Sequence, residues 1–210
     1  MSVLERIAYL QGRKDEVPNQ ELAKELVETN NADGIREIAE NIFNRDKNIQ
    51  SDCIKVIYEV GYIQPDMIAE YVGDFIKLLR SGNNRLVWGS MIALATIAAI
   101  KADEIYENLE IVLRIMEEGS VIAVDNAIKV LAAVASQNDK YSKKIFPLLL
   151  DHLSKCRPKE VAQHAESTFQ AVNQNNRDEF IKVLRERESC LTSSQISRIN
   201  KLYKKLSFAK

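Results

Sequence analysis

The sequence is poor in the residues that form turns. Seven glycines and four prolines in 210 residues are too few for an all-β protein, which needs them at its many turns. They also exclude collagen-like and disordered classes. Charge is nearly balanced, with 29 basic and 30 acidic residues and a net charge of -1. No overall field therefore directs the chain to nucleic acid or to an anionic membrane.

Long apolar runs and a disulfide pattern are also lacking. The longest uncharged stretch, between Arg85 and Lys101, has 15 residues, fewer than the roughly 20 of a membrane-spanning helix. Glu5 and Arg6 interrupt any secretion signal at the N-terminus. Three widely spaced cysteines do not make a disulfide framework. We therefore expect a cytoplasmic protein that makes no membrane contact, and a buried helix between Arg85 and Lys101.

The sequence does contain a repeat of about 37 residues. One column of apolar residues is Ile35, Val72, Leu109 and Phe146, and the next is Ile38, Phe75, Val112 and Leu149. Within each copy the apolar offsets follow i, i+3, i+4, i+7, which is one stripe of an α-helix. A second stripe begins with Ile54, Met91, Ile128 and Ala165. Each repeat is therefore predicted to be a helix pair, with a water-facing charged column at Glu40, Lys77, Arg114 and Asp151.

Polar breaks separate the predicted helices at matching positions. Residues 44–48, 80–84, 117–120 and 154–158 divide the two helices of a repeat, and residues 62–65, 101–103 and 137–139 divide successive repeats. Gly82 and Gly119 share a column, and we expect both to end helices in the left-handed conformation. Pro65 is expected in the first turn of a helix, and Asp103 and Asp139 are expected to cap helices.

A single helix pair cannot bury both of its stripes, so neighbouring pairs must stack. The sequence therefore predicts an all-α fold, a right-handed α-α superhelix with first helices on the convex side and second helices on the concave side. We expect one domain over residues 1–210. It comprises N-terminal end helices at 1–31, four repeats at 32–174 and a degenerate C-terminal repeat at 175–210.

The second helices resemble HEAT repeats, the helical hairpins of importins, phosphatase scaffolds and condensin subunits. Residues 86–98 and 122–135 match the apolar positions of the family pattern Val-Arg-x-x-Ala-x-x-x-Leu-x-x-Leu-Gly. The Arg of that pattern is absent, because Trp88, Asp125 and Ala162 follow the matching valines. The resemblance covers about two thirds of the chain and implies a diverged HEAT or armadillo-like stack. It concerns the fold rather than an activity.

Sequence motifs for catalysis are missing. There is no phosphate-binding loop, nucleophile elbow or zinc-protease motif. His152, Cys156 and His164 could approach one another on two antiparallel helices, but a fourth zinc ligand is lacking. We therefore predict a packing or surface role for these three residues, and a protein that is not an enzyme and has no metal or cofactor.

Trp88, the only tryptophan, lies in a column without other apolar core residues. It could pack between adjacent second helices, or it could anchor a partner, because Trp is enriched at interface hot spots. The surrounding positions combine apolar side chains with mixed charges, which is typical of a protein-binding groove. The predicted partner-binding residues of the concave face are Asp52, Lys55, Arg85, Trp88, Ile92, Ile122, Asp125, Asn126, Lys129, Gln163 and Glu166.

The C-terminal segment is a basic region. Residues 177–210 hold nine basic residues, Lys210 among them, and four acidic residues, which fits a solvated capping helix or a patch for nucleic acid. Our leading hypothesis is a non-enzymatic scaffold or adaptor that binds a protein segment. The alternative is a nucleic-acid-associated protein related to HEAT-like alkylpurine DNA glycosylases, although the strongly basic concave face of that family is missing. A third possibility is a subunit that assembles with its own copies.

Overall fold

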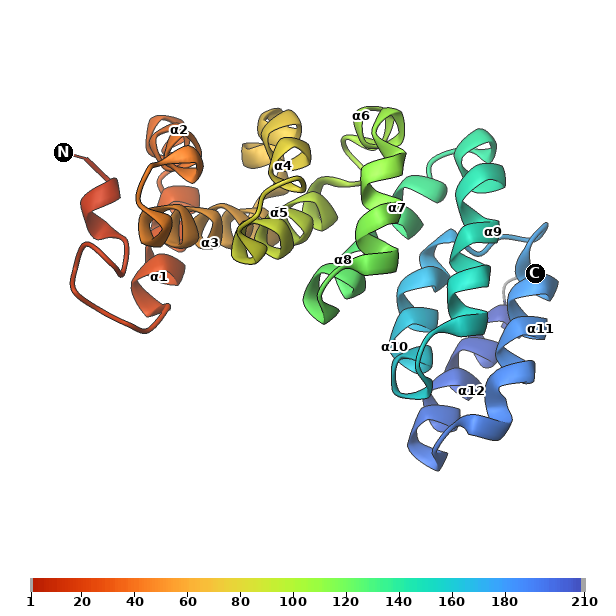
Figure 1. Ribbon diagram of the computed structural model, residues 1–210. Coiled ribbons are helices and arrows are strands. Elements are labelled where there is room, and N and C mark those ends of the chain that lie inside the picture. The colour runs from red at the N-terminus through yellow and green to blue at the C-terminus, as the bar shows by residue number, and fades with distance from the viewer. Residues whose placement is uncertain (1, 209–210) are drawn as a thin grey trace. The chain divides into compact units, whose positions relative to one another are not determined.

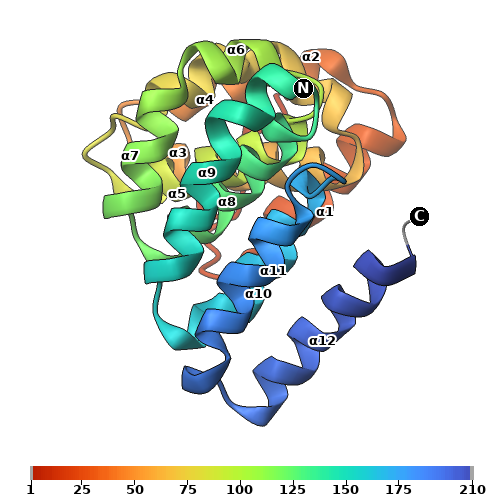
Figure 2. The same cartoon turned by 90° about the vertical axis from the view of Figure 1, so that its right-hand side faces the viewer.

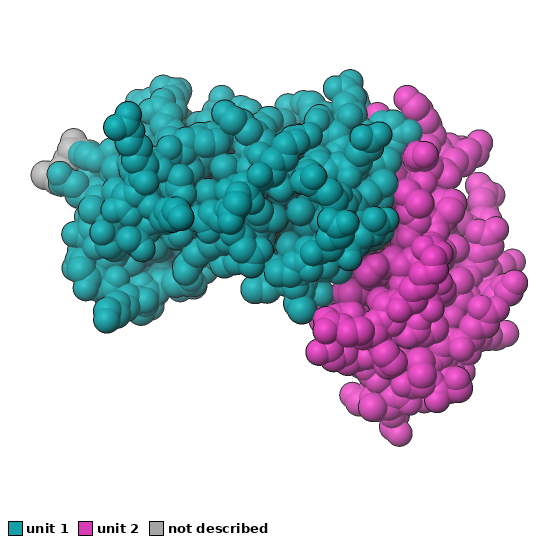
Figure 3. All heavy atoms as spheres, viewed as in Figure 1, with its two compact units in different colours: residues 1–127 teal, residues 128–210 magenta. Residues whose placement is uncertain are grey.

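The computed structural model describes residues 2–208, so Lys210 and the extreme ends of the predicted 1–210 domain lie outside the described residues (Figure 1). The described chain is helical and contains no strand, which confirms the all-α class. It forms two compact units, one ending at Ala127 and the other beginning at Ile128 (Figure 3). The division between the units falls within α8 (Val121–Ala135).

The first unit contains the N-terminal helices and the first repeats. It begins with the 3-10 turn η1 (Leu4–Arg6) and α1 (Val17–Glu28). The following elements are α2 (Ala32–Glu40), η2 (Asn41–Phe43), α3 (Lys47–Ile63), η3 (Pro65–Tyr71), α4 (Val72–Leu78), α5 (Asn84–Ile97), α6 (Ala102–Glu107), α7 (Leu109–Glu118) and the start of α8.

These elements form two layers (Figure 1). In the layer of second helices, α1 packs against α3, and α3 packs against α5. The first helices cover this layer: α2 packs against α3, and η3 and α4 pack against α5. The helix pairs are thus stacked side by side, as the repeat predicts.

The apolar stripes of the repeat form the core. Ile54, Met91, Ile128 and Ala165, which share one column, are all 0% exposed. The charged column at Glu40, Lys77, Arg114 and Asp151 is exposed in all four copies. Burying one large aliphatic side chain contributes about 1.5–3 kcal/mol, so each repeat is stabilised mainly by these stripes.

The first helices of two repeats are broken, which the predicted two-helix unit does not include. A 3-10 segment ends at Tyr71 before α4 begins. Asn108 separates α6 from α7, and its side-chain amide donates to the carbonyl of Glu104 over 3.0 Å. An asparagine that bonds the backbone four residues earlier competes with the helical hydrogen-bond pattern. These two repeats therefore consist of three helical elements.

The helix breaks fall where the sequence predicts them, but the conformation of the glycines and the capping residues differ from the prediction. Among the described glycines only Gly12 has a positive φ, so the expectation of left-handed Gly82 and Gly119 is wrong. Gly119 is extended, with φ -73° and ψ 170°, because the chain leads directly into α8. Asp103 and Asp139 lie in the first turns of α6 and α9 and do not cap them.

The second unit contains the end of α8, α9 (Asp139–Lys155), α10 (Pro158–Thr168), η4 (Phe169–Ala171), α11 (Arg177–Arg187), η5 (Glu188–Cys190) and α12 (Ser193–Phe208). Figure 2 shows α9 to α12. Here α9 packs against α11, and α10 packs against α12. Phe180, Leu184 and Ile199 are fully buried between them. Within residues 2–208, no helix has both the length and the apolar character needed to cross a membrane.

Candidate functional site

Charged and aromatic side chains gather on the second-helix layer of the first unit. Glu16, immediately before α1, contacts two helices at once. One carboxylate oxygen lies 3.0 Å from Nζ of Lys55 in α3, and the other lies 2.7 Å from a guanidinium nitrogen of Arg85 in α5. Lys55 also pairs with Glu59, one turn later in α3, at 2.6 Å. We call the following set the Glu16 cluster: Glu16, Lys55, Tyr58, Glu59, Tyr62, Arg85 and Trp88.

The aromatic members of the Glu16 cluster lie next to its cations. The Trp88 ring centroid is 6.2 Å from that of Tyr58, which is in turn 6.0 Å from Tyr62. Nζ of Lys55 lies 4.9 Å from the Tyr58 ring, and the Arg85 guanidinium lies 5.8 Å from the Trp88 ring. Trp88 is half-buried and Tyr62 is 59% exposed. Trp88 therefore packs beside α3 and also keeps part of its ring accessible.

Burial and hydrogen bonding shift the pKa values of Lys55 and Tyr58 in opposite directions. Burial alone would lower the pKa of Lys55, but hydrogen bonds to Glu59, Tyr58 and Glu16 outweigh it and raise that pKa. Burial raises the pKa of Tyr58. The two carboxylates of Glu16 and Glu59 thus favour the charged form of Lys55 and hold it in place.

The other predicted residues of the first unit differ in exposure. Asp52 is half-buried and accepts a hydrogen bond from the backbone amide of Tyr9 at 2.7 Å. Ile122 is 47% exposed, as expected, but Ile92 is only 7% exposed. The expectation that Ile92 forms part of an exposed apolar patch is therefore wrong, because α3, η3 and α4 all pack around α5.

Two further predicted residues lie at the start of α8. Asn126 is buried, and its side-chain amide donates to the carbonyl of Ile122 over 2.8 Å. Asp125 is half-buried. Asn126 thus uses its amide within its own helix.

The remaining predicted residues belong to the second unit. Lys129, Gln163 and Glu166 are exposed there. Glu166 in α10 accepts a hydrogen bond from Nε of Arg198 in α12 at 2.9 Å, and this bond lowers the pKa of Glu166. The structure therefore brings Lys55, Arg85 and Trp88 together in the first unit, with Asp52 on the same helix as Lys55.

The two units have opposite charge. Residues 1–127 hold 13 basic and 22 acidic residues, whereas residues 128–210 hold 16 basic and 8 acidic residues. The near-neutral total hides this separation. The first unit, which carries the Glu16 cluster, is therefore strongly acidic.

Four members of the cluster were not predicted from the sequence: Glu16, Tyr58, Glu59 and Tyr62. Three of them lie in α3 with Lys55, at spacings of three and four residues that place them near one another on a helix. That spacing was a signal available in the sequence. Glu16 lies before the repeats begin, and no periodic pattern connects it with Arg85.

Sequence comparison gives no relative: no protein-family model matches the chain, and no curated protein matches it. Solved structures do match. Computationally designed armadillo repeat proteins for modular peptide recognition superpose with a TM-score of 0.67 at 14% identity, over 88% of this chain and 85% of that chain. A designed armadillo repeat protein in complex with the peptide (KR)4 gives 0.68 at 13% identity, over 88% and 85%.

A longer chain contains the same arrangement of helices as well. The structure of a Kap121p mutant superposes with a TM-score of 0.70 at 16% identity, over 91% of this chain and 21% of that chain. The chain has a HEAT/armadillo-like solenoid fold. The likeness concerns the fold, since one fold supports many functions, and the expected resemblance to HEAT or armadillo-like repeats is confirmed at that level.

Proposed function

We propose that this solenoid is a non-enzymatic scaffold that binds a cationic segment of another protein across the Glu16 cluster. The observation that carries the proposal is the combination of exposed aromatic surface with an excess of acidic residues in the first unit. Lysine and arginine side chains are attracted both to aromatic faces and to carboxylates. A segment rich in lysine and arginine fits this chemistry.

The internal pairs of the cluster favour a cationic ligand. Glu16 and Glu59 together balance the charges of Lys55 and Arg85, which would otherwise repel a basic segment. Asp52, three residues before Lys55 in α3, adds a further carboxylate. Trp88 and Tyr62 then supply the apolar contact area that carries most binding energy at protein interfaces.

The similar structures support a peptide ligand. One is designed for modular peptide recognition, and another was solved with the peptide (KR)4, which is itself cationic. None of these structures supports the nucleic-acid alternative, and we do not propose it. The cytoplasmic location expected from the cysteine pattern stays a prediction.

Calorimetric titration with the peptide (KR)4 tests the proposal. We expect binding that weakens as salt rises, because surface charges are screened, and no binding of an acidic peptide of equal length. Trp88→Ala should weaken binding about tenfold or more, since hot-spot truncations cost more than ~1.4 kcal/mol. Glu59→Gln should weaken it less strongly.

Glu110→Gln provides a matched control, because Glu110 is an exposed glutamate of α7 in the layer of first helices. It removes the same charge as Glu59→Gln and should leave the affinity nearly unchanged. Equal losses for both glutamates would indicate a non-specific charge effect. Unchanged affinity in Trp88→Ala would overturn the proposed binding surface.

A further inference from the structure

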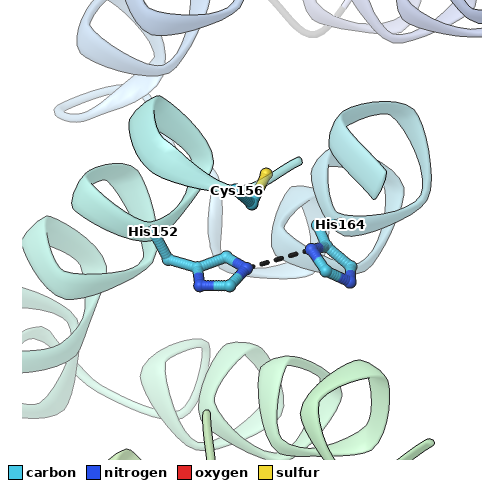
Figure 4. Close-up of side chains that lie close together, drawn as sticks. All are labelled: His152, Cys156 and His164. Carbon is cyan, nitrogen blue, oxygen red and sulfur yellow. Dashed lines mark hydrogen bonds between the residues drawn. The ribbon is translucent and has the colours of Figure 1, made fainter. Parts of the chain in front are cut away.

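A second group of reactive side chains lies in the second unit, far in sequence from the Glu16 cluster. His152 and Cys156 come from the last turn and C-cap of α9, and His164 comes from α10. Nε2 of His152 lies 3.0 Å from Nδ1 of His164 (Figure 4). One ligand atom from each residue, including Sγ of Cys156, lies within 4.8 Å of the others.

These separations suit a tetrahedral ion. Zinc bonds of ~2.0–2.1 Å to nitrogen and ~2.3 Å to sulfur place two nitrogen ligands about 3.3 Å apart and sulfur about 3.6 Å from nitrogen. The imidazole nitrogens at 3.0 Å therefore need to separate by only a few tenths of an ångström. The sulfur needs to move inward by about 1.2 Å at most, and it would leave its 3.7 Å contact with the carbonyl of Leu153.

The surrounding structure holds the three residues in place. His164 is fully buried, and the backbone amide of Cys156 donates to the carbonyl of His152 over 2.8 Å. Arg187 from α11 donates to the carbonyls of Leu153 at 3.2 Å and Cys156 at 2.7 Å. Hydrogen bonds of this kind around a site fix the orientation of its ligands.

We propose that His152, Cys156 and His164 bind one zinc ion, with a water molecule as the fourth ligand. Two imidazoles and one thiolate are ligands for zinc or cuprous ion, and not for calcium or magnesium. His152 is only half-buried, so solvent can reach the fourth position. The proposal departs from the packing role predicted from the sequence, which rested on the lack of a fourth protein ligand.

Binding is tested on the full-length, reduced protein after treatment with a chelator and dialysis. We expect one zinc ion per chain by calorimetry and a higher melting temperature with zinc, because the ion binds the folded state. We also expect Co²⁺ to give thiolate-to-metal charge-transfer absorption and the intense visible bands of a four-coordinate site. Cys156→Ser should abolish the charge-transfer absorption and weaken zinc binding by about 10-fold or more.

Cys190→Ser is the matched control, because Cys190 is exposed and is not one of the three residues whose ligand atoms converge. The Cys190→Ser variant should keep both the charge-transfer absorption with Co²⁺ and the affinity for zinc. His152→Ala supplies a second test, since this half-buried residue can be removed with less effect on the core than His164. Zinc-dependent stabilisation that persists in both Cys156→Ser and His152→Ala would overturn the proposal. So would an absence of zinc binding, or binding of cuprous ion without zinc.

Discussion

The carboxylate of Glu16 lies 3.0 Å from the ammonium nitrogen of Lys55. This contact joins the segment before α1 to the middle of α3, and the second oxygen of Glu16 continues it to Arg85 in α5. The side chain of Lys55 is only 8% exposed, whereas that of Glu16 is 43% exposed. The two partners of one ion pair therefore differ in what their removal costs.

Lys55→Met should destabilise the first unit more than Glu16→Gln does. Methionine keeps the apolar stem but removes the charge, which leaves the partly buried Glu59 without its cation, at a cost of about 1–3 kcal/mol. Glu16→Gln leaves the Lys55–Glu59 pair intact and should cost less than ~1 kcal/mol. Urea denaturation of both variants measures the free energy of unfolding. A larger loss for Glu16→Gln would contradict this account.

Gly89→Ala should destabilise the protein because α3 and α5 approach each other closely there. A Cβ atom on Gly89 would lie 2.8 Å from a side-chain carbon of Ile54, and such overpacking costs about 1–3 kcal/mol. Gly73 in α4 is the control, since a Cβ there meets nothing within 4 Å. Gly73→Ala should be stabilising by about 0.5–1 kcal/mol through helix propensity. Thermal melts with opposite signs for the two variants would support the close packing of α3 and α5.

Two isoleucines of the predicted patch should respond differently to truncation. Ile92→Ala should cost about 2–5 kcal/mol, because it creates a cavity in the core. Ile122→Ala should change stability by less than ~0.5 kcal/mol, because its side chain is exposed. The free energies of unfolding from urea titrations check this. Equal losses in the free energy of unfolding would contradict the burial of Ile92 and the exposure of Ile122.

The Glu166–Arg198 pair should contribute to stability only above a certain pH. The hydrogen bond from Arg198 lowers the pKa of Glu166 in the folded state, so its contribution is present above the unfolded pKa of about 4.3. It is lost as pH falls through the lower folded pKa. The stability difference between wild type and Glu166→Gln should therefore shrink from about pH 6 to about pH 3, and it should stay below ~1 kcal/mol because the pair is exposed. If the stability difference between wild type and Glu166→Gln grew as the pH fell, this prediction would be wrong.

Much of the fold can be predicted from the sequence because burial recurs with the repeat. Ile54, Met91 and Ile128 occupy one column and are all fully buried, since each second helix packs against its neighbours in the same way. Capping is less predictable. Asn138 caps α9 by accepting a hydrogen bond from the amide of Tyr141 at 2.9 Å, whereas the sequence predicted Asp139 as the cap.

The candidate site is harder to predict because its key contact is not periodic. Glu16 and Arg85 are 69 residues apart, and no pattern in the chain links them. Ile92 illustrates the opposite problem, since it shares a column with the exposed Lys129 and Glu166 but is buried by the elements around α5. Repeat alignment thus predicts which face a residue occupies, whereas the local neighbours determine its exposure.

The indole N–H resonance of Trp88 offers the most direct test of the proposed function. The chain has one tryptophan, so a ¹⁵N-labelled sample gives a single indole cross-peak from the Glu16 cluster. We predict that the peptide (KR)4 shifts this peak to saturation and that an acidic peptide of equal length leaves it in place. Peptide binding by calorimetry without any shift of the Trp88 peak would contradict the proposed surface.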